Sequence, residues 1–172
     1  MGHSTHDPEP FLGLLRAFEI GLVADVRRHP ASRRVPHFNA GELEPLLAAS
    51  GIGYEHMAEL GGRRRPVTGS PNAGWRSDQF QGYADHMGSA EFVSALERLL
   101  ELAAARPTAV MCAEAQWTRC HRRLLSDAVL ARGLEVLHID ARGGTEPHGL
   151  TGFAVVDRGR VIYPPVQAQL DV

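Results

Sequence analysis

The sequence contains no lysine, so each of its 18 fixed positive charges is an arginine guanidinium. Two cysteines are present among 172 residues, which excludes a disulfide-rich secreted scaffold. No apolar run approaches the roughly 18 residues that a membrane helix needs, and the first residues lack the apolar core of a signal peptide. We therefore expect a cytoplasmic protein that makes no membrane contact and keeps its thiols reduced.

The composition that remains is that of an ordinary globular chain. Hydrophobic residues make up 44% of the sequence and charged residues 22%, which excludes a disordered or fibrous protein. The net charge of −2 gives no overall indication of nucleic-acid binding. The length predicts a single domain over residues 1–172.

The arginines are unevenly distributed along the chain. An arginine bias throughout is typical of a GC-rich coding sequence, whereas a local cluster indicates a site for planar oxyanions, which the forked guanidinium binds well. Residues 27–76 contain eight arginines and four acids, and three more arginines lie at 119–123. These arginines are Arg27, Arg28, Arg33, Arg34, Arg63, Arg64, Arg65, Arg76, Arg119, Arg122 and Arg123. Their placement predicts a local basic pocket.

Apolar spacing and end signals predict alternating helices and strands. Helices are expected over residues 8–20, 40–50, 78–87, 91–105 and 119–132. Strands are expected over residues 22–26, 52–57, 108–112 and 134–139, with a hairpin over 152–163. The pattern predicts an α/β protein with a three-layer, Rossmann-like arrangement: a mostly parallel sheet, helices on both of its faces and a C-terminal β-hairpin. The loop at 59–75 has no periodicity, and loops of that length are usually functional or disordered.

Two polar segments follow predicted strands, at the sheet edge where ligands of α/β proteins bind. The first contains Asp25 and Arg27 and leads into a loop that carries Arg33 and Arg34. Asp25 is expected to orient an arginine or His3. Arg27 is expected to bind an oxyanion of the substrate.

The second segment begins with Cys112 and Glu114 and reaches Cys120, His121 and Arg122 at the start of a helix. Arginines and a helix N-terminus favour thiolate over thiol, so Cys112 is a candidate nucleophile or redox thiol. His121 or Glu114 would act as acid and base, and Arg122 would clamp an oxyanion. The alternative without a functional role is that both cysteines are thiols buried in the hydrophobic core.

These patterns predict a small thiol-dependent hydrolase or transferase with an Arg-rich anion pocket. Its substrate class would be a phosphate-bearing small molecule, a nucleotide or a nucleic-acid component. Trp75 and Tyr83 would offer ring faces to a base or sugar. The candidate catalytic residues are Cys112, Glu114, Cys120, His121 and Asp25, and the candidate binding residues are His3, Ser4, Arg27, Arg33, Arg34, Trp75, Tyr83, Arg119 and Arg122.

Three alternatives stay open from the sequence. One is a non-catalytic nucleic-acid-binding module, with phosphate contacts along residues 27–34 and 63–65 and with Trp75 stacking on bases. Another is a zinc or iron site made by Cys112, Cys120 and His121 with His3, although no cofactor is required by the main hypothesis. The third alternative concerns assembly: the chain forms a homodimer.

Several of these residues together resemble the domain of unknown function 488 family. The resemblance covers about residues 2–139, which leaves 140–172 as a C-terminal extension. It implies an α/β, Rossmann-like fold and suspected functional cysteines, but no established activity. Members usually carry an apolar first strand before Gly-His-Ser, whereas only Met1 precedes that motif here. The resemblance rests on Gly2-His-Ser-Thr-His6, Asp25-Val-Arg27, Ser32-Arg33-Arg34, Phe38-Asn39, Tyr54, Leu60-Gly-Gly62, Trp75, Phe80, Tyr83, Cys112-Ala-Glu114 and Cys120-His-Arg122.

Overall fold

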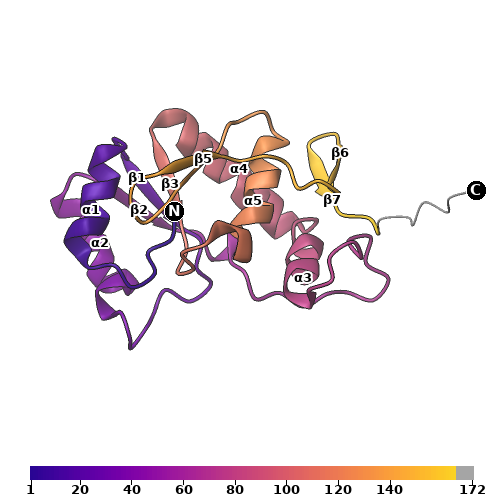
Figure 1. The fold of residues 1–172 in the computed structure, drawn as a ribbon, viewed down its shortest axis with the longest axis horizontal. Helices are drawn as coiled ribbons and strands as arrows, with labels where there is room; N and C mark the ends of the chain where they lie inside the picture. The colour runs from indigo at the N-terminus through magenta and orange to yellow at the C-terminus, as the bar shows by residue number, and fades with distance from the viewer. Residues whose placement is uncertain (166–172) are drawn as a thin grey trace, which may run out of the picture.

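A computed structural model describes residues 1–165 of the chain as a mixed α/β structure (Figure 1). Its α-helices are α1 (Pro8–Ala17), α2 (Ala40–Ala49), α3 (Asp78–His86), α4 (Ala90–Ala105) and α5 (Arg122–Leu130). Short 3-10 helices are η1 (Pro36–Phe38), η2 (Ala58–Leu60) and η3 (Trp117–Arg119). The strands are β1 (Leu22–Asp25), β2 (Gly53–His56), β3 (Thr108–Met111), β4 (Leu137–Ile139), β5 (Thr145–Pro147), β6 (Val155–Asp157) and β7 (Arg160–Ile162).

The central sheet has three parallel strands in the order β2-β1-β3. Leu22 pairs with Gly53 on one side and with Thr108 on the other, so β1 lies in the middle. All four residues of β1 are buried, as expected for a strand with neighbours on both sides. Parallel strands carry their C-terminal residues to one edge, which brings Asp25 and Met111 to the same register.

The strand expected over 134–139 forms, but it does not join this sheet. It is β4, which pairs antiparallel with β5. Beyond β3, the backbone of residues 1–3 runs alongside the strand end instead, through a parallel bridge between Gly2 and Cys112. The parallel sheet is therefore smaller than the sequence predicted, and the full three-layer Rossmann-like arrangement stays a prediction.

The predicted C-terminal hairpin is confirmed as the antiparallel pair β6 and β7. Its two turn residues, Arg158 and Gly159, both have positive φ, at 48° and 75°. That combination is typical of the two-residue turns that match the twist of a hairpin.

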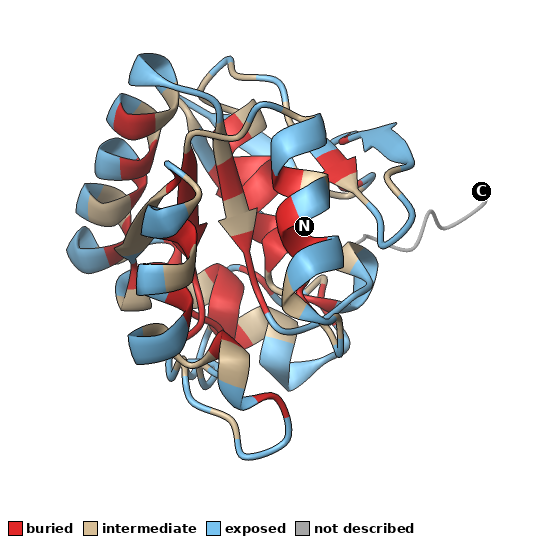
Figure 2. Ribbon diagram, turned by 90° about the vertical axis from the view of Figure 1, so that its left-hand side faces the viewer, coloured by how far each residue is buried: buried red, intermediate tan, exposed pale blue. Residues whose placement is uncertain are grey.

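Two hydrophobic clusters hold helices against the sheet (Figure 2). One joins α1 and α2 to Val23 and Met111, and the other joins α3, α4 and α5 to Ala24 and Cys112. Local signals define the helices: Pro8 opens α1, and the Ser89 hydroxyl accepts the N–H of Phe92 at 3.2 Å at the start of α4. Within residues 1–165, no helix combines the length and apolar character needed to cross a membrane.

Candidate functional site

A cleft of about 650 Å³ lies where β1 and β3 end. Four parts of the chain surround it: the N-terminal segment, the loop after β1, the loop after β3 and the start of the segment leading into α5. This is the position at which ligands bind in parallel α/β sheets. Its lining includes His3, Ser4, Arg27, Arg28, Ser32, Arg34, Gly62, Arg63, Cys112, Glu114, Arg119, Cys120 and His121.

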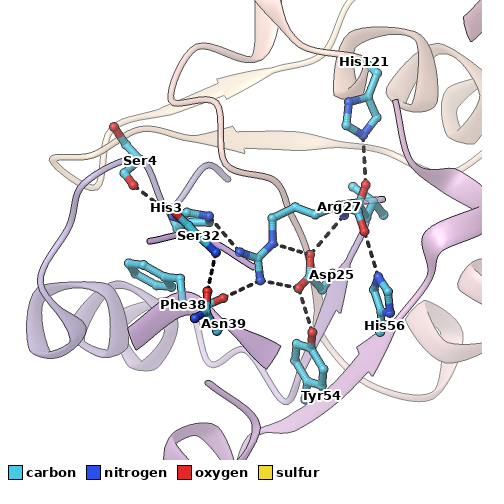
Figure 3. Close-up of polar contacts among 11 residues, drawn as sticks. His3, Ser4, Asp25, Arg27, Ser32, Phe38, Asn39, Tyr54, His56 and His121 are labelled. Atoms are coloured by element: carbon cyan, nitrogen blue, oxygen red, sulfur yellow. Dashed lines mark hydrogen bonds and ion pairs between the residues drawn. The ribbon is translucent and has the colours of Figure 1, made fainter. Parts of the chain in front are cut away.

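A buried ion pair between Asp25 and Arg27 forms one wall (Figure 3). Arg27 Nε donates to Asp25 Oδ1 at 2.8 Å, and the Arg27 guanidinium also donates to the Phe38 carbonyl at 2.7 Å. The Tyr54 hydroxyl donates to Asp25 Oδ2 at 2.7 Å. The pKa of Tyr54 is raised, mainly by burial and also by the negative charge of Asp25. Asp25 thus orients an arginine, which is one of the two roles expected for it.

His3 completes this wall in a defined tautomer. Arg27 can only donate, so the contact of 3.1 Å makes His3 Nε2 the acceptor and leaves the ring proton on Nδ1, 3.0 Å from the Ser4 carbonyl. Burial and the Arg27 charge lower the pKa of His3 to about 4. His3 is therefore a neutral ring at neutral pH, stacked on Phe38 with 4.2 Å between centroids.

Two histidines hold the backbone just after β1 (Figure 3). His56 Nε2 lies 2.8 Å from the Arg27 carbonyl, and His121 Nε2 lies 3.2 Å from the Val26 carbonyl. A carbonyl accepts only, so both Nε2 atoms carry protons. The Nδ1 atom of a neutral His121 is then left as a proton acceptor.

Nδ1 of His121 lies beside two cysteine sulfurs, and we call Cys112, Cys120 and His121 together the thiol centre. Cys120 Sγ lies 3.5 Å from His121 Nδ1, and Arg122 Nε donates to the same sulfur at 3.5 Å. Cys112 Sγ belongs to the same group, whose ligand atoms all lie within 4.8 Å of one another. Both thiols are free and buried, and both cysteines line the cleft.

The surroundings of the two cysteines favour a different protonation state for each. The Cys112 thiol, His121 and Arg122 all favour a negative sulfur on Cys120, and against the effect of burial they hold the pKa of Cys120 well below its usual value. The proton shared with Cys120, together with burial, raises the pKa of Cys112. The geometry thus favours a thiolate at Cys120 beside a protonated Cys112, whereas the sequence singled out Cys112.

Arg122 has a structural environment that does not match its expected role as an oxyanion clamp. The side chain is buried, and its guanidinium donates to the Glu114 carbonyl as well as to Cys120. It therefore fixes the loop after β3 from within. Glu114 itself is exposed on the cleft, where its carboxylate accepts the Gln116 N–H at 3.2 Å.

Exposed arginines supply the positive charge of the cleft. Arg34, Arg63 and Arg119 line it, and across residues 1–165 their guanidiniums form no ion pair or side-chain hydrogen bond. Arg28 joins them and donates to the Arg63 carbonyl at 3.1 Å. Glu114 is the acidic residue among those that surround these groups, so the cleft carries excess positive charge.

Besides Arg122, three predicted binding residues do not line the cleft. Trp75 and Tyr83 are buried in the hydrophobic cluster of α3 to α5, where Tyr83 donates its hydroxyl to the Leu60 carbonyl at 2.9 Å. Neither ring face is therefore open to a base or sugar. Arg33 is exposed but is not among the residues that line the cleft, unlike its neighbour Arg34.

The sulfurs of Cys112 and Cys120 and Nδ1 of His121 also suit a zinc ion. Thiolate and imidazole are preferred zinc ligands, and a ligating histidine usually donates its other N–H to a carbonyl, as His121 does to Val26. His3, proposed as a further ligand, is not part of this group and has its Nε2 atom bound to Arg27.

Gly62 packs directly against the His121 ring, where a larger residue would not fit. A Cβ at Gly62 would lie 2.7 Å from His121 Nδ1, whereas one at Gly41 in α2 would meet nothing within 4 Å. Gly62→Ala should lower the free energy of unfolding by roughly 1–3 kcal/mol through overpacking. Gly41→Ala should raise it by about 0.5–1 kcal/mol through helix propensity. Urea unfolding of both variants tests this, and equal effects would contradict the assigned position of His121.

The fold and the site together define a class of protein: a mixed α/β protein in which a buried pair of thiols borders a cleft lined by arginines. Within that class, the family model described as Domain of unknown function DUF488 matches residues 7–129, and the chain belongs to this family. The matched range contains Asp25, Arg27, Cys112, Cys120 and His121. Comparisons with curated proteins and with solved structures give no match.

Proposed function

We propose that the protein is a small thiol-dependent hydrolase or transferase for an anionic substrate bound in the cleft. One observation carries this proposal: the Cys120 and His121 pair opens onto a cleft whose Arg34, Arg63 and Arg119 side chains lack anionic partners in the described part of the chain. The substrate class would be a phosphorylated small molecule, a nucleotide or a nucleic-acid fragment, because guanidiniums match phosphate oxygens in charge and geometry.

The residues support a two-step reaction with balanced proton transfer. The Cys120 thiolate forms a bond to the electrophilic atom, the bond to the leaving group breaks, and protonated His121 gives its Nδ1 proton to that group. His121 then removes a proton from water or from an acceptor alcohol, which attacks the intermediate and releases Cys120 as thiolate. Cys112 would hold the thiolate through its S–H group.

The nucleic-acid-binding module receives less support. It depended on Trp75 as a stacking ring, and that ring is buried against Phe80, Phe153 and Tyr163. The cleft also contains the thiol centre, which a purely electrostatic binding surface does not need. A zinc-binding protein is the second candidate, and stoichiometric zinc in protein purified without chelators would replace the thiolate mechanism by a metal one.

Protection from alkylation tests the proposed anion site. Pyrophosphate should slow the reaction of Cys120 with iodoacetamide in a saturable way, with Cys120 followed by mass spectrometry of its peptide. Because a hydrogen bond to a charged group is worth about 1.5–3 kcal/mol, Arg34→Gln or Arg119→Gln should weaken this protection roughly tenfold or more.

Arg98→Gln is the matched control for that experiment. Arg98 lies on α4 in an exposed pair with Glu55, away from the cleft lining, so its replacement should leave protection unchanged. Absence of protection at low ionic strength, or an equal loss in all three variants, would rule out the anion site.

A further inference from the structure

A second polar network lies outside the cleft and is independent of the proposed function. The side chains of Asp127 on α5 and His148 are fully buried, and His138 on β4 is a buried residue as well. His148 Nε2 lies 2.9 Å from Asp127 Oδ1, and His148 Nδ1 lies 2.9 Å from His138 Nε2. The three side chains therefore form a continuous chain from a carboxylate to the His138 ring.

The direction of the hydrogen bonds in this chain follows from Asp127. Its carboxylate accepts the Thr151 N–H at 2.9 Å and the Tyr163 hydroxyl at 2.8 Å as well as His148. Burial alone would raise the pKa of Asp127, but these bonds together lower it, so the group is an ionised acceptor. His148 must then donate through Nε2. In the neutral form of the His148 ring, Nδ1 is an acceptor and receives the Nε2–H of His138.

The consequence appears at the far end of the chain, on His138 Nδ1. With the ring proton on Nε2, Nδ1 carries a free lone pair, and no residue within 1–165 forms a hydrogen bond to it. The ring is also fixed in orientation, because Trp117 stacks on it with 3.9 Å between centroids and 4° between planes. Trp117 is held in turn by Glu146, whose carboxylate accepts the indole N–H at 3.2 Å.

His138 lines a groove of about 340 Å³ between the end of α1, α4, β3, α5 and β4. Most of the lining is apolar, including Phe18, Leu100, Val110 and Leu125. Arg122 also lines the groove, but its guanidinium donates to the Glu114 carbonyl. A volume of this size is at the lower end of the range for small-molecule sites.

We propose that this groove is a binding site for a small, mainly apolar molecule that carries one N–H or O–H donor, such as a phenol or an indole. The apolar lining would take up the ring, and His138 Nδ1 would accept the single donor. Asp127 and His148 act as positioning residues, because together they keep a lone pair rather than an N–H group on Nδ1 of this groove-lining ring.

Indole and benzofuran are suitable probes, since they share a shape but only indole carries an N–H donor. One neutral hydrogen bond in a buried site corresponds to about a tenfold change in affinity, so indole should bind about tenfold more tightly in calorimetry or NMR titration. Equal affinities, or no binding of either probe, would overturn the proposal. The nitrogen chemical shifts of His138 should also show a protonated Nε2 and an unprotonated Nδ1, and the opposite tautomer would overturn it.

His138→Phe separates the hydrogen bond from the shape of the site. Phenylalanine keeps a flat ring against Trp117 but has no lone pair, so indole and benzofuran should bind this variant equally. His29→Phe, at an exposed position outside the groove, should keep the tenfold ratio. Because the two probes are first compared on the unaltered protein, a poorly folded variant leaves the main test intact.

Discussion

Replacing Arg27 by methionine should lower the free energy of unfolding by about 3–5 kcal/mol, because it leaves the buried Asp25 carboxylate without its cation. Asp25 is fully buried and Arg27 is 7% exposed, so water cannot take over the lost bonds. The substitution would also remove the donors to the Phe38 carbonyl and to His3. Urea unfolding, followed by circular dichroism, measures the change.

Two further variants show whether the effect comes from the buried charge. Arg98→Met breaks an ion pair of the same type whose arginine is 54% exposed, and such pairs contribute roughly 1 kcal/mol or less. In the double variant Asp25→Leu with Arg27→Met, no buried charge remains, and much of the lost stability should return. If Arg27→Met costs no more than Arg98→Met, the ion pair does not hold this wall of the cleft.

The rate at which Cys120 is alkylated should be nearly independent of pH between about pH 5 and 8, since its lowered pKa keeps it a thiolate throughout that range. The thiolate is lost only as the pH falls through the lowered pKa. For a cysteine with an ordinary pKa of about 8.5, the rate would instead rise about a thousandfold over the same three pH units. The flat profile, rather than a high absolute rate, is the expected result, because nucleophilicity falls together with pKa.

The neighbouring thiol provides the control for this profile. Cys112 has a raised pKa and should stay unmodified over the same range, so Cys120→Ser should remove the flat reaction altogether. Cys112→Ser retains a hydroxyl that can donate to Cys120 and should preserve the profile. A rate for Cys120 that rises tenfold per pH unit would contradict the thiolate and with it the proposed mechanism.

The position of the site could be predicted from sequence because it depends on local patterns. The apolar run at 22–26 and the strand expected at 108–112 end in polar residues, and parallel strands bring such ends together. That rule required β1 and β3 to be neighbours, which the sequence does not show. The structure pairs the two strands, so Asp25 lies in register with Met111, next to Cys112. The family resemblance is likewise confirmed by the match over residues 7–129.

The features that the sequence did not predict depend on tertiary packing. Arg122 and Trp75 belong to types that also occur on binding surfaces, and only the packing of α5 and α3 determines that both are buried. Tyr54 reaches Asp25 because β2 pairs with β1, a fact about strand order. The chain from Asp127 to His138 links segments that have no shared motif, so no local signal identified it.

The guanidinium lining of the cleft has a consequence for chemical modification of the protein. Because the sequence has no lysine, the cleft holds no side-chain amine that acetylation or an acylating reagent could neutralise. Arginine stays protonated at any pH at which proteins are normally handled, so alkaline buffers do not remove the charge either. Dicarbonyl reagents that react with guanidiniums would instead label Arg34, Arg63 and Arg119 directly, and would distinguish the exposed charges of the cleft from the buried Arg27 and Arg122.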